Sequence, residues 1–264
     1  MVVELIVTFL ICIGATTIGA ITGVGGGIII KPVLDAFSSM TVAQISFLSG
    51  CTALSMAVVS MCKKKGGESM FDKEVAVKLA AGSVLGGFLG QWLFGVIKDS
   101  YNQDSVIGIV QNVVMIILLV GIILYMANKK KIKTHRVTSV VGCMLTGVVL
   151  GVFSSFLGIG GGPINLVALY FFFSMTTKVA AYNSIFVILC SQIASIVMSF
   201  STNSIPELNY IFLVFMVIGG VLGGVIGKKI AKKISDEQVE FTFFGLLVVI
   251  AIISSYNIYN FATM

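Results

Sequence analysis

The sequence has few charged residues and few of the side chains that usually bind metals or act as nucleophiles. Only 11% of its 264 residues are charged, against about 25% in typical soluble domains. It contains one histidine, and its five cysteines are scattered without a CxxC pair. These shortages argue against a soluble globular domain, a disulfide framework and a cysteine or histidine metal site.

Motifs of enzymes and nucleotide-binding proteins are also missing. The sequence has no HExxH, no GxSxG and no complete P-loop or dinucleotide-binding pattern. We therefore expect that the protein is not an enzyme, that no residue is catalytic, and that it needs no cofactor or metal. Its net charge of +6 comes from short lysine clusters, which lack the basic face that nucleic-acid binding requires.

Long apolar runs fill the chain instead. Hydrophobic residues make up 57% of it, and a run of about 18 or more apolar residues can span a bilayer. Because no stretch between the runs is long enough to fold separately, we expect a single multi-pass domain over 1–264 in the cell membrane. The runs lie at 5–22, 42–62, 75–97, 106–127, 137–157, 179–200, 208–227 and 239–258.

The chain matches itself at a shift of 135 residues. Positions 23–41, GVGGGIIIKPVLDAFSSMT, align without gaps with 158–176, GIGGGPINLVALYFFFSMT, and ten of the nineteen residues are identical. At a shift of 137, GSVLGGFLGQ at 82–91 aligns with GGVLGGVIGK at 219–228. Two motif pairs at nearly one offset indicate an internal duplication.

The duplication divides the chain into two repeats. The first covers about 1–128 and the second about 137–264, and the basic loop 129–136 connects them. Each repeat carries the same motifs in the same order, so we expect the two repeats to share one helix arrangement.

The lysines indicate that the repeats have opposite orientations, since positive charges favour cytoplasmic loops. If the apolar segments after the glycines, 28–38 and 163–173, count as short traverses, each repeat has five passes. Loops 63–73, 129–136 and 228–236 are then all cytoplasmic, and both termini lie outside. The predicted fold is an all-α polytopic membrane protein with an inverted repeat, about eight full transmembrane helices and two short broken or re-entrant half-helices.

The two short segments are too short to cross a bilayer as helices. Eleven residues give roughly 16 Å of helix, whereas the hydrocarbon core is about 30 Å thick. Thr41 and Gln44 fit a capping box at the start of the next helix. Pro163, directly after the second glycine run, suits the first turn of a helix.

The glycines fall into two kinds. Those in the second motif have the small-xxx-small spacing of packed transmembrane helices. The consecutive glycines of GVGGG and GIGGG instead break a helix, because each costs about 1 kcal/mol in helix propensity and permits positive φ. A helix that begins at such a break directs free N–H groups and its dipole toward it, which favours anion binding; the other interpretation is a structural hinge. The spaced glycines are Gly82, Gly86, Gly90, Gly219, Gly223 and Gly227.

Polar residues inside apolar spans are candidate functional residues. Thr22 and Ser155 lie beside the two breaks, and Ser49 and Ser184 occupy equivalent positions in the repeats. Asn183 adjoins Ser184. We therefore expect these five side chains to face the breaks.

Lys31 and Asp35 are four residues apart on the first short helix. They either pair with each other, or Lys31 balances a bound anion while Asp35 is a coupling candidate for protons or ions. The predicted substrate-binding set is Thr22, Gly23, Gly25, Gly26, Gly27, Lys31, Ser49, Ser155, Gly158, Gly160, Gly161, Gly162, Asn183 and Ser184.

With these motifs the sequence resembles the sulfite exporter TauE/SafE family, which is also grouped with the 4-toluene sulfonate uptake permeases. The resemblance rests on the apolar spans, the duplication and the pair GVGGGIIIKPVL at 23–34 and GIGGGPINLVAL at 158–169. The second copy departs from the first because it has Pro163 and no proline at position 167. The resemblance implies transport of sulfur-containing anions such as sulfite and sulfonates.

The sequence therefore predicts a membrane permease, a secondary transporter that moves small sulfur-containing oxyanions by alternating access. The alternatives are an anion channel and a transporter of a different small organic or inorganic anion. The expected partners are the anion, the lipid bilayer and a coupled proton or ion, with no nucleic acid. The exact anion, the direction of transport and the oligomeric state do not follow from the sequence.

Overall fold

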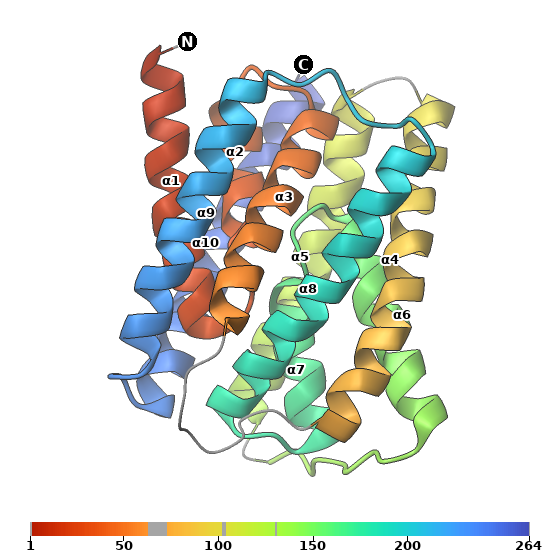
Figure 1. The fold of residues 1–264 in the computed structure, drawn as a ribbon, viewed down its shortest axis with the longest axis vertical. Coiled ribbons are helices and arrows are strands. Elements are labelled where there is room, and N and C mark those ends of the chain that lie inside the picture. The colour runs from red at the N-terminus through yellow and green to blue at the C-terminus, as the bar shows by residue number, and fades with distance from the viewer. Residues whose placement is uncertain (1, 63–72, 102–103, 130, 264) are drawn as a thin grey trace.

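A computed structural model describes residues 2–62, 73–101, 104–129 and 131–263, and in these residues the chain forms ten α-helices and no strand. Figure 1 shows the helices as one upright bundle. Their bounds are α1 Val2–Thr22, α2 Gly27–Phe37, α3 Val42–Met61, α4 Lys73–Tyr101, α5 Asp104–Asn128, α6 Val140–Phe156, α7 Gly162–Phe173, α8 Thr177–Ser201, α9 Tyr210–Ala231 and α10 Asp236–Thr263.

Seven of these helices are long and apolar enough to cross a membrane. Helix α6 has 17 residues, one fewer than that length requires, and α2 and α7 have 11 and 12. Long apolar helices are viable in lipid because they satisfy their backbone hydrogen bonds internally. The predicted class, an all-α polytopic membrane protein with two short helices, is confirmed.

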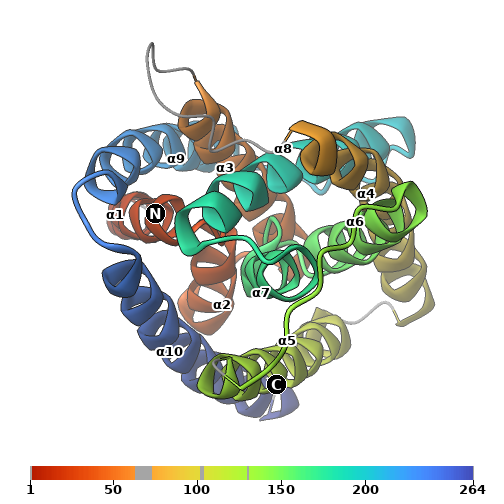
Figure 2. The ribbon, with the colours of Figure 1, turned by 90° about the horizontal axis from the view of Figure 1, so that it is seen from below.

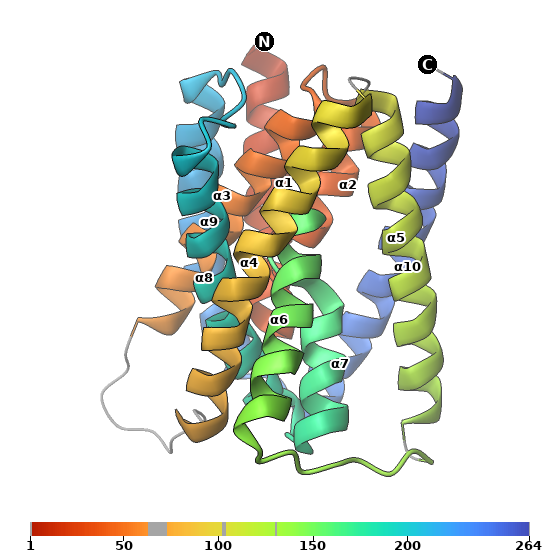
Figure 3. The same cartoon turned by 90° about the vertical axis from the view of Figure 1, so that its right-hand side faces the viewer.

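The two sets of five helices run in opposite directions. The end of the bundle where both termini lie is called the terminal end here, and the opposite end is the loop end. Helix α1 starts at the terminal end, whereas α6 starts at the loop end (Figure 3). The short helix α2 lies in the terminal half and α7 in the loop half (Figure 1). This is the relation expected for an inverted repeat.

The connections that carry positive charge meet at the loop end. The segment after α5 and the α9–α10 connection both lie there (Figure 3). Lys129 forms an ion pair with Glu240 at 2.6 Å, and Lys178 lies 3.9 Å from Asp236. Residues 63–72 of the first predicted cytoplasmic loop, and Lys130, are outside the described residues. A single face for these lysines agrees with the charge argument, and its assignment to the cytoplasm stays a prediction.

Each helix group mixes the two repeats. Helix α4 packs against α6 and α8, and α9 packs against α1 and α3. Helices α5 and α10 pack together along one side, while α2 and α7 lie in the middle of the bundle (Figure 2). The repeats are therefore interlocked and do not form two separate halves.

Glycines make these interlocked contacts possible. A Cβ at Gly82, Gly86 or Gly90 of α4 would lie 2.1 to 2.4 Å from a carbonyl oxygen of α6. In the other group a Cβ at Gly223 or Gly227 would meet the backbone of α1 at 2.4 to 2.5 Å. The missing side chains let the backbones approach closely. The predicted packing role of these glycines is confirmed.

Local signals at the short helices are also confirmed. Thr41 caps α3: its hydroxyl accepts from the Gln44 N–H at 3.2 Å, and the Gln44 side chain accepts from the Thr41 N–H at 2.8 Å. Pro163 lies in the first turn of α7. At the terminal end, the Ser38 hydroxyl donates to Glu4 at 3.2 Å, which ties the end of α2 to the start of α1.

Two glycines of α4 provide a matched test of this packing. A Cβ at Gly86 would lie 2.1 Å from the Val148 carbonyl oxygen, whereas a Cβ at Gly95 meets no atom within 4 Å. We expect Gly86→Ala to lower the free energy of unfolding by about 1–3 kcal/mol through overpacking. Gly95→Ala should be neutral or slightly stabilising, because alanine favours helix. Thermal unfolding in detergent measures both, and equal melting temperatures would contradict the packing.

Cysteine accessibility tests the common loop end. In a Cys62→Ser background, we expect Thr134→Cys and Ser235→Cys to react with an impermeant thiol reagent from one side of a sealed vesicle. Glu207→Cys, in the α8–α9 connection at the terminal end, should react only from the other side. Modification of positions 134 and 235 from opposite sides would exclude this arrangement.

Candidate functional site

Both glycine runs break the chain with backbone conformations that favour glycine. In the first run Gly23 and Gly25 have φ of 79° and 82°. In the second, Gly158 and Gly160 have φ of 63° and 73°. Such left-handed conformations are costly for residues with a Cβ. Gly161 and Gly162 are also left-handed, so the second run is the more irregular of the two.

The two runs meet at the centre of the bundle and form what we call the glycine junction, residues 23–27 and 158–162. The Gly162 N–H donates to the Val24 carbonyl at 3.0 Å. A Cβ at Gly25 would lie 3.2 Å from the Gly160 carbonyl oxygen, and one at Gly27 would lie 2.5 Å from that of Ile159. Any side chain at Gly27 would therefore displace the opposite run.

Two serines secure the junction in a symmetric way. The Ser184 hydroxyl donates to the Gly23 carbonyl at 2.6 Å, and the Ser49 hydroxyl donates to the Gly158 carbonyl. Ser184 is 135 residues after Ser49, and Gly158 is 135 residues after Gly23. Each serine thus binds the break of the other repeat. The two serines satisfy carbonyl groups that the broken helices leave free.

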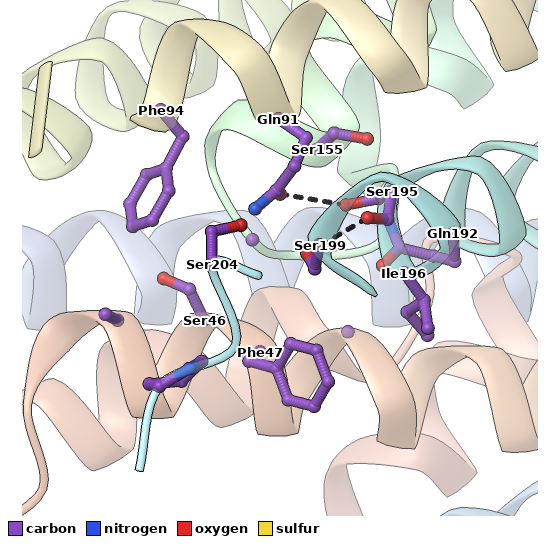
Figure 4. Close-up of a pocket in the computed structure, with 14 residues that line it drawn as sticks. Ser46, Phe47, Gln91, Phe94, Ser155, Gln192, Ser195, Ile196, Ser199 and Ser204 are labelled. Atoms are coloured by element: carbon purple, nitrogen blue, oxygen red, sulfur yellow. Dashed lines mark hydrogen bonds between the residues drawn. The ribbon is translucent and has the colours of Figure 1, made fainter. Parts of the chain in front are cut away.

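Beside the second break lies a polar cavity, here called the serine cavity. Its walls come from the first turns of α3, the last turns of α4 and α8, the second break and the α8–α9 connection (Figure 4). Its volume of about 30 Å³ holds one or two water molecules. The polar lining residues are Ser46, Gln91, Ser155, Gln192, Ser195, Ser199 and Ser204.

Two hydroxyl groups of this cavity have no hydrogen-bond partner in the protein. Ser155 and Ser46 are 3% and 9% exposed, and the Oγ atoms of both are buried and unpaired. A buried hydroxyl without a partner costs free energy unless a ligand or water completes it. Ser155 and Ser46 are therefore the donors most available to a bound molecule.

The amides of the cavity are held by neighbouring hydroxyls. The Ser195 hydroxyl donates to Gln91 Oε1 at 3.0 Å, which connects α8 to α4. The Gln192 amide nitrogen donates to Ser154 Oγ at 3.1 Å. Figure 4 shows the Gln91 and Ser195 side chains joined from opposite walls. The site offers neutral hydrogen-bond donors and no group suited to acid–base or nucleophilic chemistry.

The first break has no matching polar lining. At a shift of 135, Ala181 stands where the second repeat's break meets Ser46, and Ala20 stands where Ser155 lies. The packing itself is equivalent: a Cβ at Gly23 would lie 2.3 Å from the Ala181 Cα, and one at Gly158 would lie 2.6 Å from the Ser46 Cβ. The symmetric backbone thus carries an asymmetric site.

The predicted single pocket between two opposed helix N-termini is not what the structure shows. The two breaks are in direct contact, and the Gly162 N–H at the start of α7 is bound by the opposite run. The cavity lies to one side of this contact, at the terminal half. Close backbone packing explains the difference, because glycines leave no side-chain volume to hold the breaks apart.

Lys31 and Asp35 form a buried ion pair. The Lys31 ammonium donates to Asp35 Oδ2 at 2.7 Å, and the residues are 2% and 6% exposed. Nearby, the Asn257 amide of α10 donates to the Pro32 carbonyl at 2.8 Å. Of the two interpretations of these residues, the structure contains the mutual pair. Neither residue lines the serine cavity.

The remaining predicted residues are placed as follows. Thr22 is buried and its hydroxyl donates to the Ile18 carbonyl at 2.8 Å. The Asn183 amide donates to the Val179 carbonyl, also at 2.8 Å. Of the predicted set, only Ser155 and Gly158 line the cavity. The junction contains Gly23, Gly25, Gly26, Gly27, Gly158, Gly160, Gly161 and Gly162, and Ser49 and Ser184 bind it.

Several lining residues were not in the predicted set. Gln91 and Ser46 show no repeat signal, since their equivalents are Lys228 and Ala181. On α8, however, Ser191, Ser195 and Ser199 follow one another at intervals of four. Such a stripe places hydroxyls on one helix face inside an apolar span, and it was a usable signal.

Among the described residues, no group of three or more histidine, cysteine, aspartate or glutamate side chains is arranged to hold a metal ion.

Comparison with known proteins supplies the family. A family model described as sulfite exporter TauE/SafE matches residues 8–253. Neither the curated proteins nor the solved structures contain a match.

The junction serines give a test of the symmetric hydrogen bonds. Ser49→Ala and Ser184→Ala each leave a buried glycine carbonyl without its partner, so we expect each to lower the free energy of unfolding by about 1–3 kcal/mol. Ser255→Ala, whose hydroxyl is exposed on α10 and binds its own helix, is the control. Denaturation in detergent measures all three. A loss in only one of the junction variants would show that the two bonds are not equivalent.

Proposed function

This chain belongs to the sulfite exporter TauE/SafE family, and from that membership and the site geometry we propose that it is a secondary transporter of small sulfur-containing oxyanions. The family implies an exporter-type membrane permease for sulfite or related sulfur anions. The observation that carries the proposal is the serine cavity, where unpaired buried hydroxyls lie beside a broken helix at the centre of the bundle.

The chemistry of the cavity suits an oxyanion. Oxyanion oxygens accept hydrogen bonds, and the free Ser46 and Ser155 hydroxyls donate them. Unwound backbone in a membrane is tolerated where protein buries it or where it lines a cavity. Broken helices at the midplane of inverted-repeat transporters form substrate sites of this kind.

The size of the cavity supports a moving carrier. A volume of about 30 Å³ is too small for an anion of four or five heavy atoms, so binding requires the walls of the cavity to separate. The walls come from both repeats, because α3 and α4 belong to the first and α8 to the second. A rocking of the interlocked groups around the junction would open one end and close the other.

Equivalent contacts close the two ends. At the terminal half, Ser195 of α8 donates to Gln91 of α4 at 3.0 Å. The equivalent of Gln91 is Lys228 of α9, whose ammonium donates to the carbonyls of Val59, at 3.4 Å, and Cys62 at the end of α3. Each contact ties a helix of one repeat to a helix of the other. Alternating access would break one of these contacts while keeping the other.

The driving force would come from a gradient, since no nucleotide-binding motif is present in the sequence. Asp35 remains our candidate for coupling to protons or ions, and its ion pair with Lys31 would have to open during the cycle. A buried pair of this kind costs much to break. That cost makes the pair a plausible control point of a coupled carrier.

Transport in proteoliposomes tests the proposal. We expect uptake of labelled sulfite that saturates and shows counterflow, as a carrier does. Ser155→Ala should raise KM by about 2- to 10-fold, the loss of one hydrogen bond, and Ser255→Ala should not. Linear flux without counterflow would favour an anion channel. An absence of uptake of sulfite, sulfate and sulfonates would contradict the proposal.

A further inference from the structure

The serine cavity has no charged side chain among the residues that line it. Its polar groups are all serine hydroxyls and glutamine amides. Lining residues from α3, α4, α8 and the α8–α9 connection are uncharged, as are Ser155 and Gly158 at the second break. An anion in this cavity would be held by hydrogen bonds alone.

The nearest buried cation in the sequence does not change this balance. Lys31 belongs to α2 and does not line the cavity, and Asp35 neutralises it at 2.7 Å. Lys228 donates to carbonyl groups at the end of α3, toward the loop end. Neither lysine is placed to compensate a charge beside Ser46 and Ser155.

The cost of burying an ion rises with the square of its charge. A dianion therefore pays about four times the desolvation cost of a monoanion of equal size. Neutral donors can offset that cost for one delocalised charge, and a second charge usually requires a cation in the site. A site built only from hydroxyls and amides selects against the second charge.

We propose that the serine cavity binds monoanionic oxyanions, namely bisulfite and sulfonates, in preference to dianions such as sulfate. The inference rests on the proposed transport function and specifies the charge of its substrate. Ser46 and Ser155 supply the free donors, and Gln91 and Gln192 complete the neutral lining.

Two competitors of nearly equal size and different fixed charge test the inference. Methanesulfonate is a monoanion and sulfate a dianion, and both have a tetrahedral sulfur. Inhibition of labelled sulfite uptake by each is measured on the full chain in proteoliposomes. We expect methanesulfonate to inhibit at a concentration at least about ten-fold lower than sulfate, a ratio that corresponds to about 1.4 kcal/mol.

A variant with one added charge should reverse the selectivity. Gln91→Lys introduces a cation into the cavity wall, and a lysine is already present at the equivalent position 228. We expect it to improve sulfate inhibition relative to methanesulfonate by about ten-fold. Gln91→Met, which is uncharged and similar in length, is the control and should keep the wild-type order. Gln192→Lys serves as a second charged variant if the first does not fold.

The outcomes separate the two proposals. Sulfite uptake that sulfate inhibits as well as methanesulfonate, or that methanesulfonate does not inhibit, would overturn the inference and leave the transporter function standing. Unchanged selectivity in a folded lysine variant would also overturn it. Failure of the wild-type protein to take up sulfite at all would overturn both.

Discussion

Direct contact between the two glycine runs is the constraint on which the rest of the structure depends. The Gly162 N–H binds the Val24 carbonyl at 3.0 Å, and the two runs pass so close that Gly27 has no room for a Cβ. Because the runs touch, α2 and α7 must start at the centre of the bundle and extend toward opposite ends. The surrounding helices then enclose two short helices that could not span a membrane alone. Ser49 and Ser184 complete this centre by bonding to carbonyls that the breaks expose.

The interlocking of the repeats follows from the same arrangement. Helix α4 leaves its own repeat to pack on α6 and α8, and α9 packs on α1 and α3. Glycines along α4 and α9 bring the backbones together where bulkier residues would collide. In lipid there is little hydrophobic gain from helix association, so close van der Waals packing carries much of the stability. A change in one group must therefore be felt by helices of both repeats, which is the mechanical basis for alternating access.

The asymmetry of the side chains gives the symmetric backbone a function. Ser46 and Ser155 make a polar cavity at one break, whereas Ala181 and Ala20 occupy the equivalent positions at the other. Likewise Lys31 and Asp35 form a buried pair on α2, while Leu166 and Tyr170 stand in their places on α7. A duplicated chain can keep the inverted framework that moves and still place its substrate groups on one side only.

Much of the framework was determined by the sequence alone. Apolar length predicted the spanning helices, the glycine runs predicted the breaks, and the Thr41–Gln44 pair predicted the start of α3, because each depends on chemistry local to a few residues. The site was predicted only in part: Ser155 and Gly158 line the cavity, but Ser46, Gln91 and Ser195 come from three different helices. Their meeting depends on how α3, α4 and α8 cross, and so does the contact that replaced the expected pocket between the breaks. Only the tertiary structure decided these points, because helix crossings are set by backbone approach between distant segments and leave no local pattern.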